Sequence, residues 1–333
     1  MALSRKAFVW CLVLAALAFR ATGQFAHRPI RMEMSSDAMG STFSIVLYGN
    51  DKVLMEQAAN ESFAEARRLD RELSNYKPDS ELTLVNQQAA NHRVKITPEL
   101  FDLLTACADY SRQSSGAFDI TIGPLMKVWG FYNHAGAVPP TGELAKARSQ
   151  VGYRHVHLYT KTKTVSFDRT GVELDLGGIG KGYAVDQMVE ILKRKGIDTA
   201  LVSASRSSIY GLGAPPTEPR GWPVTIDSSP YTNSPPFIVY LRNLSLSTSG
   251  IDQKFFRAHG RIYGHIMDPR TGHPARGSAL VSVIAPRTID SETWTKPIFI
   301  NGTVWAATNV PKLFRVLFCS DEQSPNCRWV PLT

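Results

Sequence analysis

Apolar residues recur at helical spacing in three segments of the 333-residue chain. In the segment 51–73 they fall near every third or fourth position, at Leu54, Ala58, Phe63, Ala66, Leu69 and Leu73. Thr97 followed by Pro98 has the residues of a helix cap and first turn, which predicts a second helix that ends near 114–116. A third helix is predicted to run to about Lys195.

Shorter apolar or alternating runs predict strands at 43–48, 155–159, 164–167, 199–203 and 280–285, with others around Val224, Ile238 and Leu246. The segment 117–132 starts like a strand, 24–38 looks like a loose lead-in, and 291–298 predicts a short helix. Because strands and helices are mixed without regular βαβ alternation, the pattern predicts the α+β class.

The segment 173–186, ELDLGGIGKGYAVD, is predicted to join an apolar strand to the third helix through the glycine pair 177–178. Backbone N–H groups at such a turn lie close to a ligand, and the helix N-terminus carries partial positive charge, so the turn suits an anion. Its spacing matches neither the dinucleotide GxGxxG pattern nor a P-loop. Taken alone, it also fits an ordinary glycine-rich strand–helix turn.

The first 23 residues have the pattern of a secretory signal. Arg5 and Lys6 precede an apolar run at 7–19, and small residues follow at 21–23. Cleavage there would lower the net charge from +8 to +5, because it removes Arg5, Lys6 and Arg20. We therefore expect export across the inner membrane to the periplasm or cell envelope, with an uncleaved N-terminal anchor as the alternative. The remaining basicity suits an acidic ligand but lacks the dense Lys/Arg stripe of a nucleic-acid binder.

Three cysteines remain after the predicted signal. Cys319 and Cys327 flank a turn-rich segment between apolar runs, and in an oxidising compartment we expect them to form a disulfide across a hairpin. Cys107 lies on the apolar face of the second helix and is predicted to be buried.

Candidate chemistry gathers near His265 and Asp268, which are three residues apart at the start of the turn 268–272. A histidine at a strand-to-turn junction can act as a base, and Arg270 can pair with phosphate. The more common use of Asp268 in such a turn is as a cap.

Asp119 and Tyr76 are two further candidate site residues, and each also has an ordinary structural interpretation. Asp119 fits an acidic residue in a surface turn, and Tyr76 fits an aromatic residue used for packing. No histidine or cysteine falls at zinc-site spacing, and no GxSxG or papain-like cysteine motif occurs. Taken one by one, these residues identify no reaction.

As an ordered set, six blocks of the chain resemble the FAD:protein FMN transferases, the ApbE-like family. They are MGST at 39–42, LSNYKPDSELTLVN at 73–86, SGAFDITIGPLMKVWGF at 115–131, DLGGIGKGYAVD at 175–186, STSG at 247–250 and HIMDPRTGHP at 265–274. The resemblance implies one large mixed domain, 24–333, of antiparallel-rich sheets with packed helices.

The resemblance also implies a reaction. In this family FAD is held with Mg²⁺ at its pyrophosphate, and a threonine hydroxyl of a partner flavoprotein attacks the FMN phosphorus while AMP leaves. By motif match, the FAD-contacting positions are Met39, Tyr76, Ala117, Phe118, Asp119, Asp175, Lys181 and Ile266. Gly178 matches a backbone-carbonyl metal ligand, and His265, in the turn it shares with Asp268, matches the base.

Two segments depart from the family pattern. Ser205-Arg206 stands where a glycine pair is common, so its side chains would crowd the ligand or Arg206 would add a phosphate contact. In the metal-binding segment, Glu292 replaces an aspartate and Lys296 replaces a threonine. An ammonium has no lone pair for a metal ion, so Thr295 or Asp290 would have to supply the missing ligand.

The leading hypothesis is thus an exported FMN transferase that acts on FAD, Mg²⁺ and a threonine-bearing acceptor flavoprotein, with any membrane association made through that acceptor. The alternatives are a flavin-binding homologue without transferase activity, in which Lys296 takes the place of the metal, and an FAD pyrophosphatase that uses water instead of the acceptor.

Overall fold

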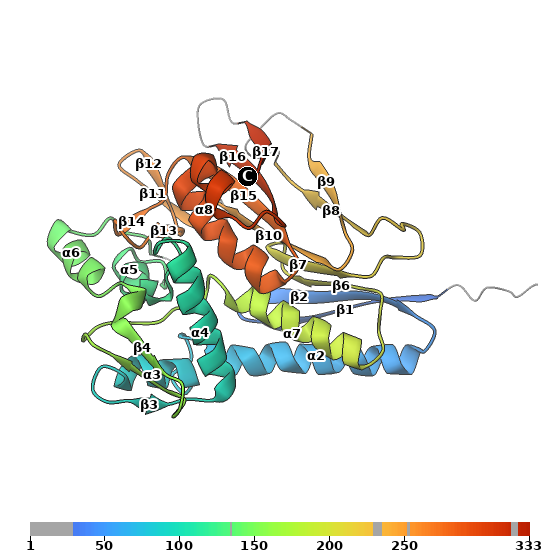
Figure 1. The fold of residues 1–333 in the computed structure, drawn as a ribbon, viewed down its shortest axis with the longest axis horizontal. Coiled ribbons are helices and arrows are strands. Elements are labelled where there is room, and N and C mark those ends of the chain that lie inside the picture. Colours follow the sequence, from blue (N-terminus) through green and yellow to red (C-terminus); the bar gives the residue numbers. More distant parts are fainter. Residues whose placement is uncertain (1–28, 134, 229–234, 252–253, 321–325) are drawn as a thin grey trace, which may run out of the picture.

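An eight-stranded antiparallel sheet forms the centre of the computed structural model, which describes residues 29–133, 135–228, 235–251, 254–320 and 326–333 (Figure 1). In spatial order its strands are β1 (Ile30–Ala38), β2 (Ser41–Gly49), β6 (Ala200–Ala204), β7 (Ser208–Leu212), β10 (Leu244–Gly250), β15 (Ser278–Ala285), β16 (Arg315–Ser320) and β17 (Cys327–Val330).

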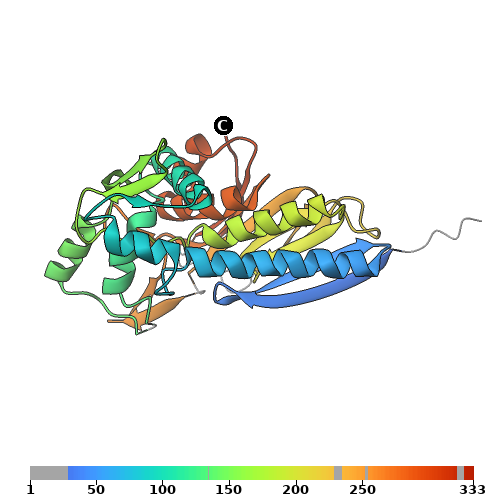
Figure 2. The same cartoon turned by 90° about the horizontal axis from the view of Figure 1, so that it is seen from below.

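Both faces of this sheet are covered. Three helices pack on one face, namely α2 (Lys52–Leu73), α7 (Gly180–Arg194) and α8 (Thr288–Asn309), and Figure 2 shows α2 and α7 side by side along it. The hairpin of β8 (Trp222–Ile226) and β9 (Phe237–Leu241) covers the other face. Alternate strand residues therefore enter different cores: Ile45 and Val283 join the helix side, and Val46 and Ile284 the hairpin side.

A smaller group of elements lies at one end of the sheet (Figure 1). It contains α3 (Glu81–Gln88), α4 (Pro98–Gln113), η1 (Ile120–Ile122), α5 (Gly123–Val128), α6 (Thr141–Ser149), η2 (Tyr153–His155), and the sheet of β3 (Val94–Lys95), β5 (Thr164–Phe167) and β4 (Val156–Tyr159). Two hairpins lie at the same end, β11 (Phe255–Ala258) with β12 (Arg261–Gly264), and β13 (Met267–Asp268) with β14 (His273–Pro274).

The helix cap predicted at Thr97 is confirmed, and Asp51 caps α2 in the same way. Asp51 accepts a hydrogen bond from the backbone N–H of Leu54 (3.0 Å) at the start of α2, and Thr97 accepts one from Leu100 (3.3 Å) at the start of α4. The strands predicted at 155–159 and 164–167 are β4 and β5, which pair with each other, and the predicted strand at 199–203 is β6. The α+β class is confirmed.

Four local predictions differ from the structure. The loose lead-in contains β1, which looks polar because it is an edge strand that pairs only with β2. The strand-like start of 117–132 is a turn followed by η1 and α5, and the apolar segment before Gly177 joins no sheet. The short helix at 291–298 belongs to the longer α8, which contains Pro297 and is kinked at the non-helical Gly302 (φ 76°).

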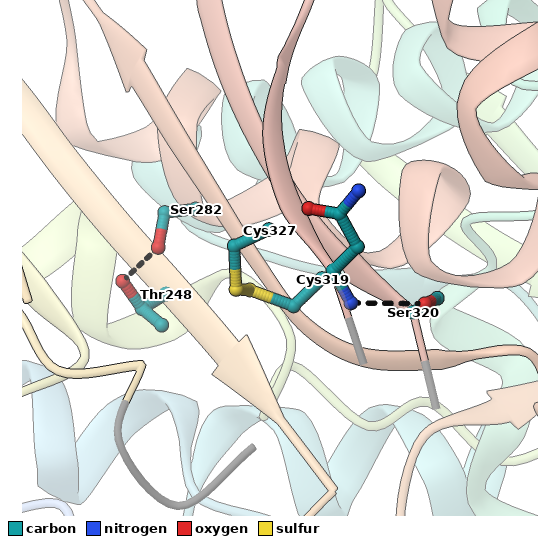
Figure 3. Close-up of a disulfide and its surroundings, with 6 residues drawn as sticks. Thr248, Ser282, Cys319, Ser320 and Cys327 are labelled. Carbon is teal, nitrogen blue, oxygen red and sulfur yellow. Dashed lines mark hydrogen bonds between the residues drawn. A yellow bond between two sulfur atoms is a disulfide. The ribbon is translucent and has the colours of Figure 1, made fainter. Parts of the chain in front are cut away.

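The predicted disulfide is confirmed. Cys319 and Cys327 lie opposite each other in β16 and β17 and are bonded, as Figure 3 shows. Cys107 is buried, and burial raises the pKa of its thiol. None of the helices in the described ranges combines the length and apolar content needed to span a bilayer. The predicted signal at 1–23 lies outside the described residues.

Candidate active site

The glycine turn is held by side chains and loops rather than by a sheet. The amide of Asn86, at the end of α3, accepts from the backbone N–H of Leu174 (2.7 Å) and donates to its C=O (3.0 Å). The N–H of Asp175 donates to the C=O of Ile120 (2.7 Å), and Gly123 donates to Glu173 (3.3 Å). Asn86, the last residue of the second sequence block, thus makes the hydrogen bonds that a neighbouring strand would make in a sheet.

We expect Asn86→Ala to lower the free energy of unfolding by about 1–3 kcal/mol, because the buried N–H and C=O of Leu174 then lose their partner. Urea unfolding followed by circular dichroism measures the change. Asn91→Ala is the matched control, since Asn91 is exposed shortly after the same helix. Equal effects of the two substitutions would contradict the role given to Asn86.

Asp175 is oriented by two hydrogen bonds. Its Oδ1 accepts from the N–H of Gly177 (2.7 Å), and its Oδ2 accepts from the hydroxyl of Tyr132 (2.8 Å), which also accepts from Nδ2 of Asn75 (2.9 Å). The ring of Tyr76 meets Tyr132 edge-on at 5.3 Å between centroids and is 63% exposed. Burial and the charge of Asp175 raise the pKa of both tyrosines. The structure thus brings Asp175 and Tyr76 together through Tyr132. This tyrosine was not predicted as a site residue, although it directly follows the third block.

The third block places Ala117 and Phe118 in the protein interior. The Cε2 atom of Phe118 lies 3.5 Å from the point where a Cβ on Gly178 would stand, so this ring packs against the glycine turn. Asp119 is held by its own loop: one oxygen accepts from the N–H and hydroxyl of Thr121 (2.8 and 2.7 Å), and the other from the N–H of Tyr153 (2.6 Å). Burial raises the pKa of Asp119.

Asp119 also borders a cleft with a volume of about 690 Å³. Arg148, Tyr153 and Arg270 contribute to its wall, so the cleft connects the third block to the turn after His265. The two blocks are 150 residues apart in the chain and meet only through the fold.

His265 follows β12 directly and makes two contacts with Lys254. Its backbone N–H donates to the C=O of Lys254 (3.0 Å), and its ring Nδ1 lies 3.1 Å from the same oxygen. Since a carbonyl oxygen only accepts, Nδ1 carries the proton and Nε2 keeps a free lone pair. Burial lowers the pKa of His265 to about 4, and the charges of Lys296, Lys254 and Lys181 add to this effect. At neutral pH the imidazole is uncharged and able to accept a proton.

Asp268 is occupied by its own turn. Its carboxylate accepts from the backbone N–H and Nε of Arg270 (both 2.9 Å) and from a second guanidinium nitrogen (3.0 Å), and Arg270 also donates to Asn301 (2.8 Å). These contacts favour a structural role, and the predicted catalytic role of Asp268 stays a prediction. Ile266 is buried and its C=O accepts from Ala275 (2.8 Å), which places His265 at the edge of the β13–β14 turn.

Glu292 and Lys296 of α8 lie against the glycine turn and the start of α7. The carboxylate of Glu292 accepts a hydrogen bond from the N–H of Gly182 in the first turn of α7, and its other oxygen lies 3.6 Å from Nζ of Lys181. Nζ of Lys296 donates to the backbone C=O of Glu292 (2.9 Å), and its Cε lies 3.5 Å from the Cβ position of Gly178. Burial lowers the pKa of Lys296 to about 8, which leaves the side chain mostly protonated at neutral pH.

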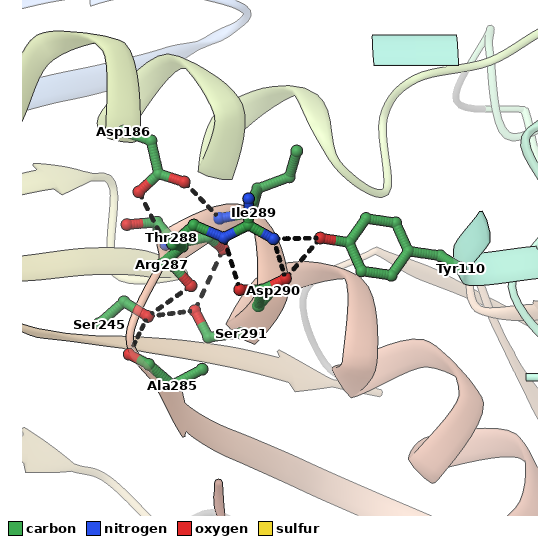
Figure 4. A network of polar contacts seen from close by, with 9 residues as sticks. All are labelled: Tyr110, Asp186, Ser245, Ala285, Arg287, Thr288, Ile289, Asp290 and Ser291. Carbon is green, nitrogen blue, oxygen red and sulfur yellow. Dashed lines mark hydrogen bonds and ion pairs between the residues drawn. The ribbon is translucent and has the colours of Figure 1, made fainter. Parts of the chain in front are cut away.

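The polar network in Figure 4 fixes α8 in this position. Asp186 of α7 accepts from the N–H groups of Thr288 (2.7 Å) and Ile289 (2.9 Å) at the start of α8. Ser245 and Ser247 of β10 bond to Ser291 (3.0 and 2.8 Å). The fourth and fifth sequence blocks therefore contain residues that position α8 against the glycine turn, a role that their spacing did not reveal.

The residues predicted to hold Mg²⁺ do not fit that ion. The hydroxyl of Thr295 is bonded to Ser249 (2.8 Å) and to the C=O of Glu292 (2.7 Å), and the carboxylate of Glu292 is engaged by Gly182 and Lys181. The other candidate, Asp290, is held by Arg287 and Tyr110. An ammonium, which offers no lone pair, stands beside Gly178. In the part of the chain that the structure describes, no group of three or more His, Cys, Asp or Glu side chains is arranged to hold a metal.

Met39 and the altered pair Ser205-Arg206 lie at neighbouring turns. Met39 adopts a left-handed conformation (φ 51°) between β1 and β2, and Ser205 does so (φ 54°) between β6 and β7. The N–H of Ser205 donates to the C=O of Thr42 (2.8 Å). Ser205 thus keeps a backbone geometry that favours glycine, and the exposed Arg206 beside it is a candidate phosphate contact.

The fold and these residues are those of a flavin transferase of the ApbE type, and the comparisons with known proteins agree. The ApbE family model matches residues 39–313, so the chain belongs to the ApbE family. A FAD:protein FMN transferase of Treponema pallidum is 32% identical over 259 residues, which is 74% of this chain and 71% of the relative. One from Klebsiella pneumoniae is 28% identical over 268 residues, 80% of this chain and 81% of the relative.

Two solved structures are similar along nearly their whole length. The ApbE protein of Thermotoga maritima has a TM-score of 0.79 and 27% identity, and the match covers 89% of this chain and 96% of that one. The flavinyl transferase ApbE of Pseudomonas stutzeri, in its apo form, has a TM-score of 0.80 and 26% identity, with 91% and 96% covered. The predicted family and its α+β fold are therefore confirmed.

Proposed function

We propose that this protein is an FAD:protein FMN transferase that moves FMN from FAD to a threonine hydroxyl of a partner flavoprotein and releases AMP. The observation that carries the proposal is that Lys181 and Lys296 lie at the glycine turn, with an uncharged His265 near enough for the charges of both lysines to lower its pKa. These groups come from three separate segments of the chain, and together they offer cations for a diphosphate beside a base.

Different residues bind FAD and take up the proton. The ammonium of Lys181 binds the flavin diphosphate beside the glycine turn, and the exposed ring of Tyr76 offers a surface for the flavin rings. Nε2 of His265 takes the proton as the threonine oxygen bonds to the FMN phosphorus. The bond from that phosphorus to the bridging oxygen breaks, and AMP leaves with the electron pair.

The cell envelope is the proposed place of action. The signal-like pattern at 1–23 supports it, and so does the Cys319–Cys327 disulfide, because such bonds persist in oxidising compartments. The proposed partner is an acceptor flavoprotein with a target threonine, and an acceptor embedded in a membrane would bring the enzyme to that membrane. Mg²⁺, which the family resemblance implies, stays a prediction, and the donor set described above does not support it.

Incubation with FAD and a threonine-bearing acceptor domain tests the activity. We expect the intact mass of the acceptor to rise by one FMN phosphoester, with one AMP released for each acceptor modified. A Thr→Val acceptor is the control and stays unmodified. Free FMN and AMP without acceptor modification would instead show an FAD pyrophosphatase, and bound FAD without AMP release would show a flavin-binding protein.

A further inference from the structure

Lys296 is a cation without an anionic partner at the centre of the site. Its Nζ makes one hydrogen bond, to the backbone C=O of Glu292 (2.9 Å). Among the described residues, no carboxylate oxygen lies within 4.0 Å of this nitrogen, whereas Lys181 has Glu292 at 3.6 Å. An ammonium carries three N–H donors, and a charge placed away from water is costly unless it is paired. An anionic ligand that pairs with this ammonium therefore offsets the cost of its burial.

The side chain is directed to where that anion would bind. Cε of Lys296 lies 3.5 Å from the Cβ position of Gly178, so the ammonium stands beside the glycine turn. The arrangement is stiff: Lys296 is on a helix whose first turn is capped by Asp186, and its neighbour Thr295 is bonded to Ser249 of β10. The nitrogen is thus held close to the backbone that receives the diphosphate.

Charge favours the ammonium over a divalent ion at this place. Among the described residues, Glu292 is the carboxylate that lies within 4.0 Å of Lys181, and none lies that close to Lys296; His265 nearby is uncharged. A diphosphate adds the negative charge that completes the pairing. A divalent cation placed among the same groups would meet two ammonium groups and a carboxylate already bonded to Gly182.

We propose that the ammonium of Lys296 supplies the positive charge that binds the diphosphate of FAD at the glycine turn, so that binding and FMN transfer need no divalent metal. The inference rests on the proposed function. Lys296 donates hydrogen bonds to diphosphate oxygens and forms no covalent bond, and the bonds made and broken are those of the transfer described above.

The first test is made on the unaltered protein. FAD affinity, from quenching of flavin fluorescence or calorimetry, is measured after metal removal in EDTA and again in excess Mg²⁺. We expect the two dissociation constants to agree within about twofold, and transfer rates to behave alike. Loss of FAD binding or transfer in EDTA that Mg²⁺ restores would overturn the proposal. FAD binding that is unaffected by EDTA, with no transfer under any condition, would refute the proposed function and the transfer part of this inference, while supporting metal-free FAD binding.

The second test uses variants. Lys296→Met is expected to weaken FAD binding by about 10- to 100-fold, with no rescue by Mg²⁺, because a charge-assisted contact is lost. Lys296→Thr removes the charge but adds an oxygen ligand beside Glu292, and we expect its FAD affinity to become Mg²⁺-dependent. Lys312→Met, which changes an exposed lysine beyond α8, is the control and binds FAD as the unaltered protein does. FAD binding by folded Lys296→Met at full affinity would refute the role.

Discussion

His265→Ala is expected to lower the rate of FMN transfer by about 10²- to 10⁴-fold and to leave FAD affinity nearly unchanged. The reason is the geometry of the ring, whose Nδ1 is bonded to the C=O of Lys254 at 3.1 Å and whose Nε2 is free to accept the proton of the attacking hydroxyl. The measurement is single-turnover transfer to an acceptor domain, together with FAD binding by fluorescence. A transfer rate equal to that of the unaltered protein would exclude His265 as the base.

The pH dependence provides a second view of the same group. His265 acts only when uncharged, and its pKa in the free protein is lowered to about 4, so protonation begins only near that pH. We therefore expect kcat/KM to stay level from pH 7 to about pH 5 and to fall toward pH 4, whereas an unperturbed histidine base would already lose activity near pH 6.5. A midpoint near 6.5 would show that a different group accepts the proton.

Gly182→Ala is expected to cost about 3 kcal/mol or more in the free energy of unfolding, and to weaken FAD binding in whatever protein remains folded. A Cβ at this position would stand 2.6 Å from the C=O of Thr288 and 2.8 Å from a carboxylate oxygen of Glu292. Both atoms belong to α8, which Asp186 and β10 hold in place, so the helices would have to separate.

Gly180→Ala is the matched control for this substitution. Gly180 is the first residue of the same helix, and a Cβ there would meet no atom within 4 Å. Alanine also favours helix more than glycine does, so we expect stability to be unchanged or to rise by up to about 1 kcal/mol. Urea unfolding compares the two variants, and equal losses of stability would show that close contact between α7 and α8 is not what requires glycine at 182.

Much of the local structure was predictable because it depends on neighbouring residues. The cap at Thr97 follows from a side chain that bonds to the next turn, and the hairpin disulfide follows from two cysteines around a turn. The segment before Gly177 was mistaken for a strand because it is apolar and extended. Its partner is the amide of Asn86, 88 residues away, and no period in the sequence encodes that contact.

For the candidate site, too, some features were predictable from the sequence and others depended on the fold. The kinds of residue, and their match to an ordered set of family blocks, were readable from the chain, and so was the lysine at position 296. Their roles depended on contacts between segments: Asp268 is occupied by Arg270, Asp119 by its own loop, and Tyr132 holds Asp175. Because of those contacts, several residues that looked like site residues in the sequence have a supporting role: they hold the site in place.

By itself, the sequence determined the family, the α+β class, the helix cap at Thr97 and the disulfide, because each depends on residue order or on short-range bonding. Only the tertiary structure decided that α8 lies against the glycine turn, with Glu292 bonded to Gly182 and Lys296 directed at Gly178. The charge at an active site is a sum over groups that packing brings together. Whether a lysine there is a surface residue, a defect or the site's own cation is therefore decided by distance in space, which the order of residues does not contain.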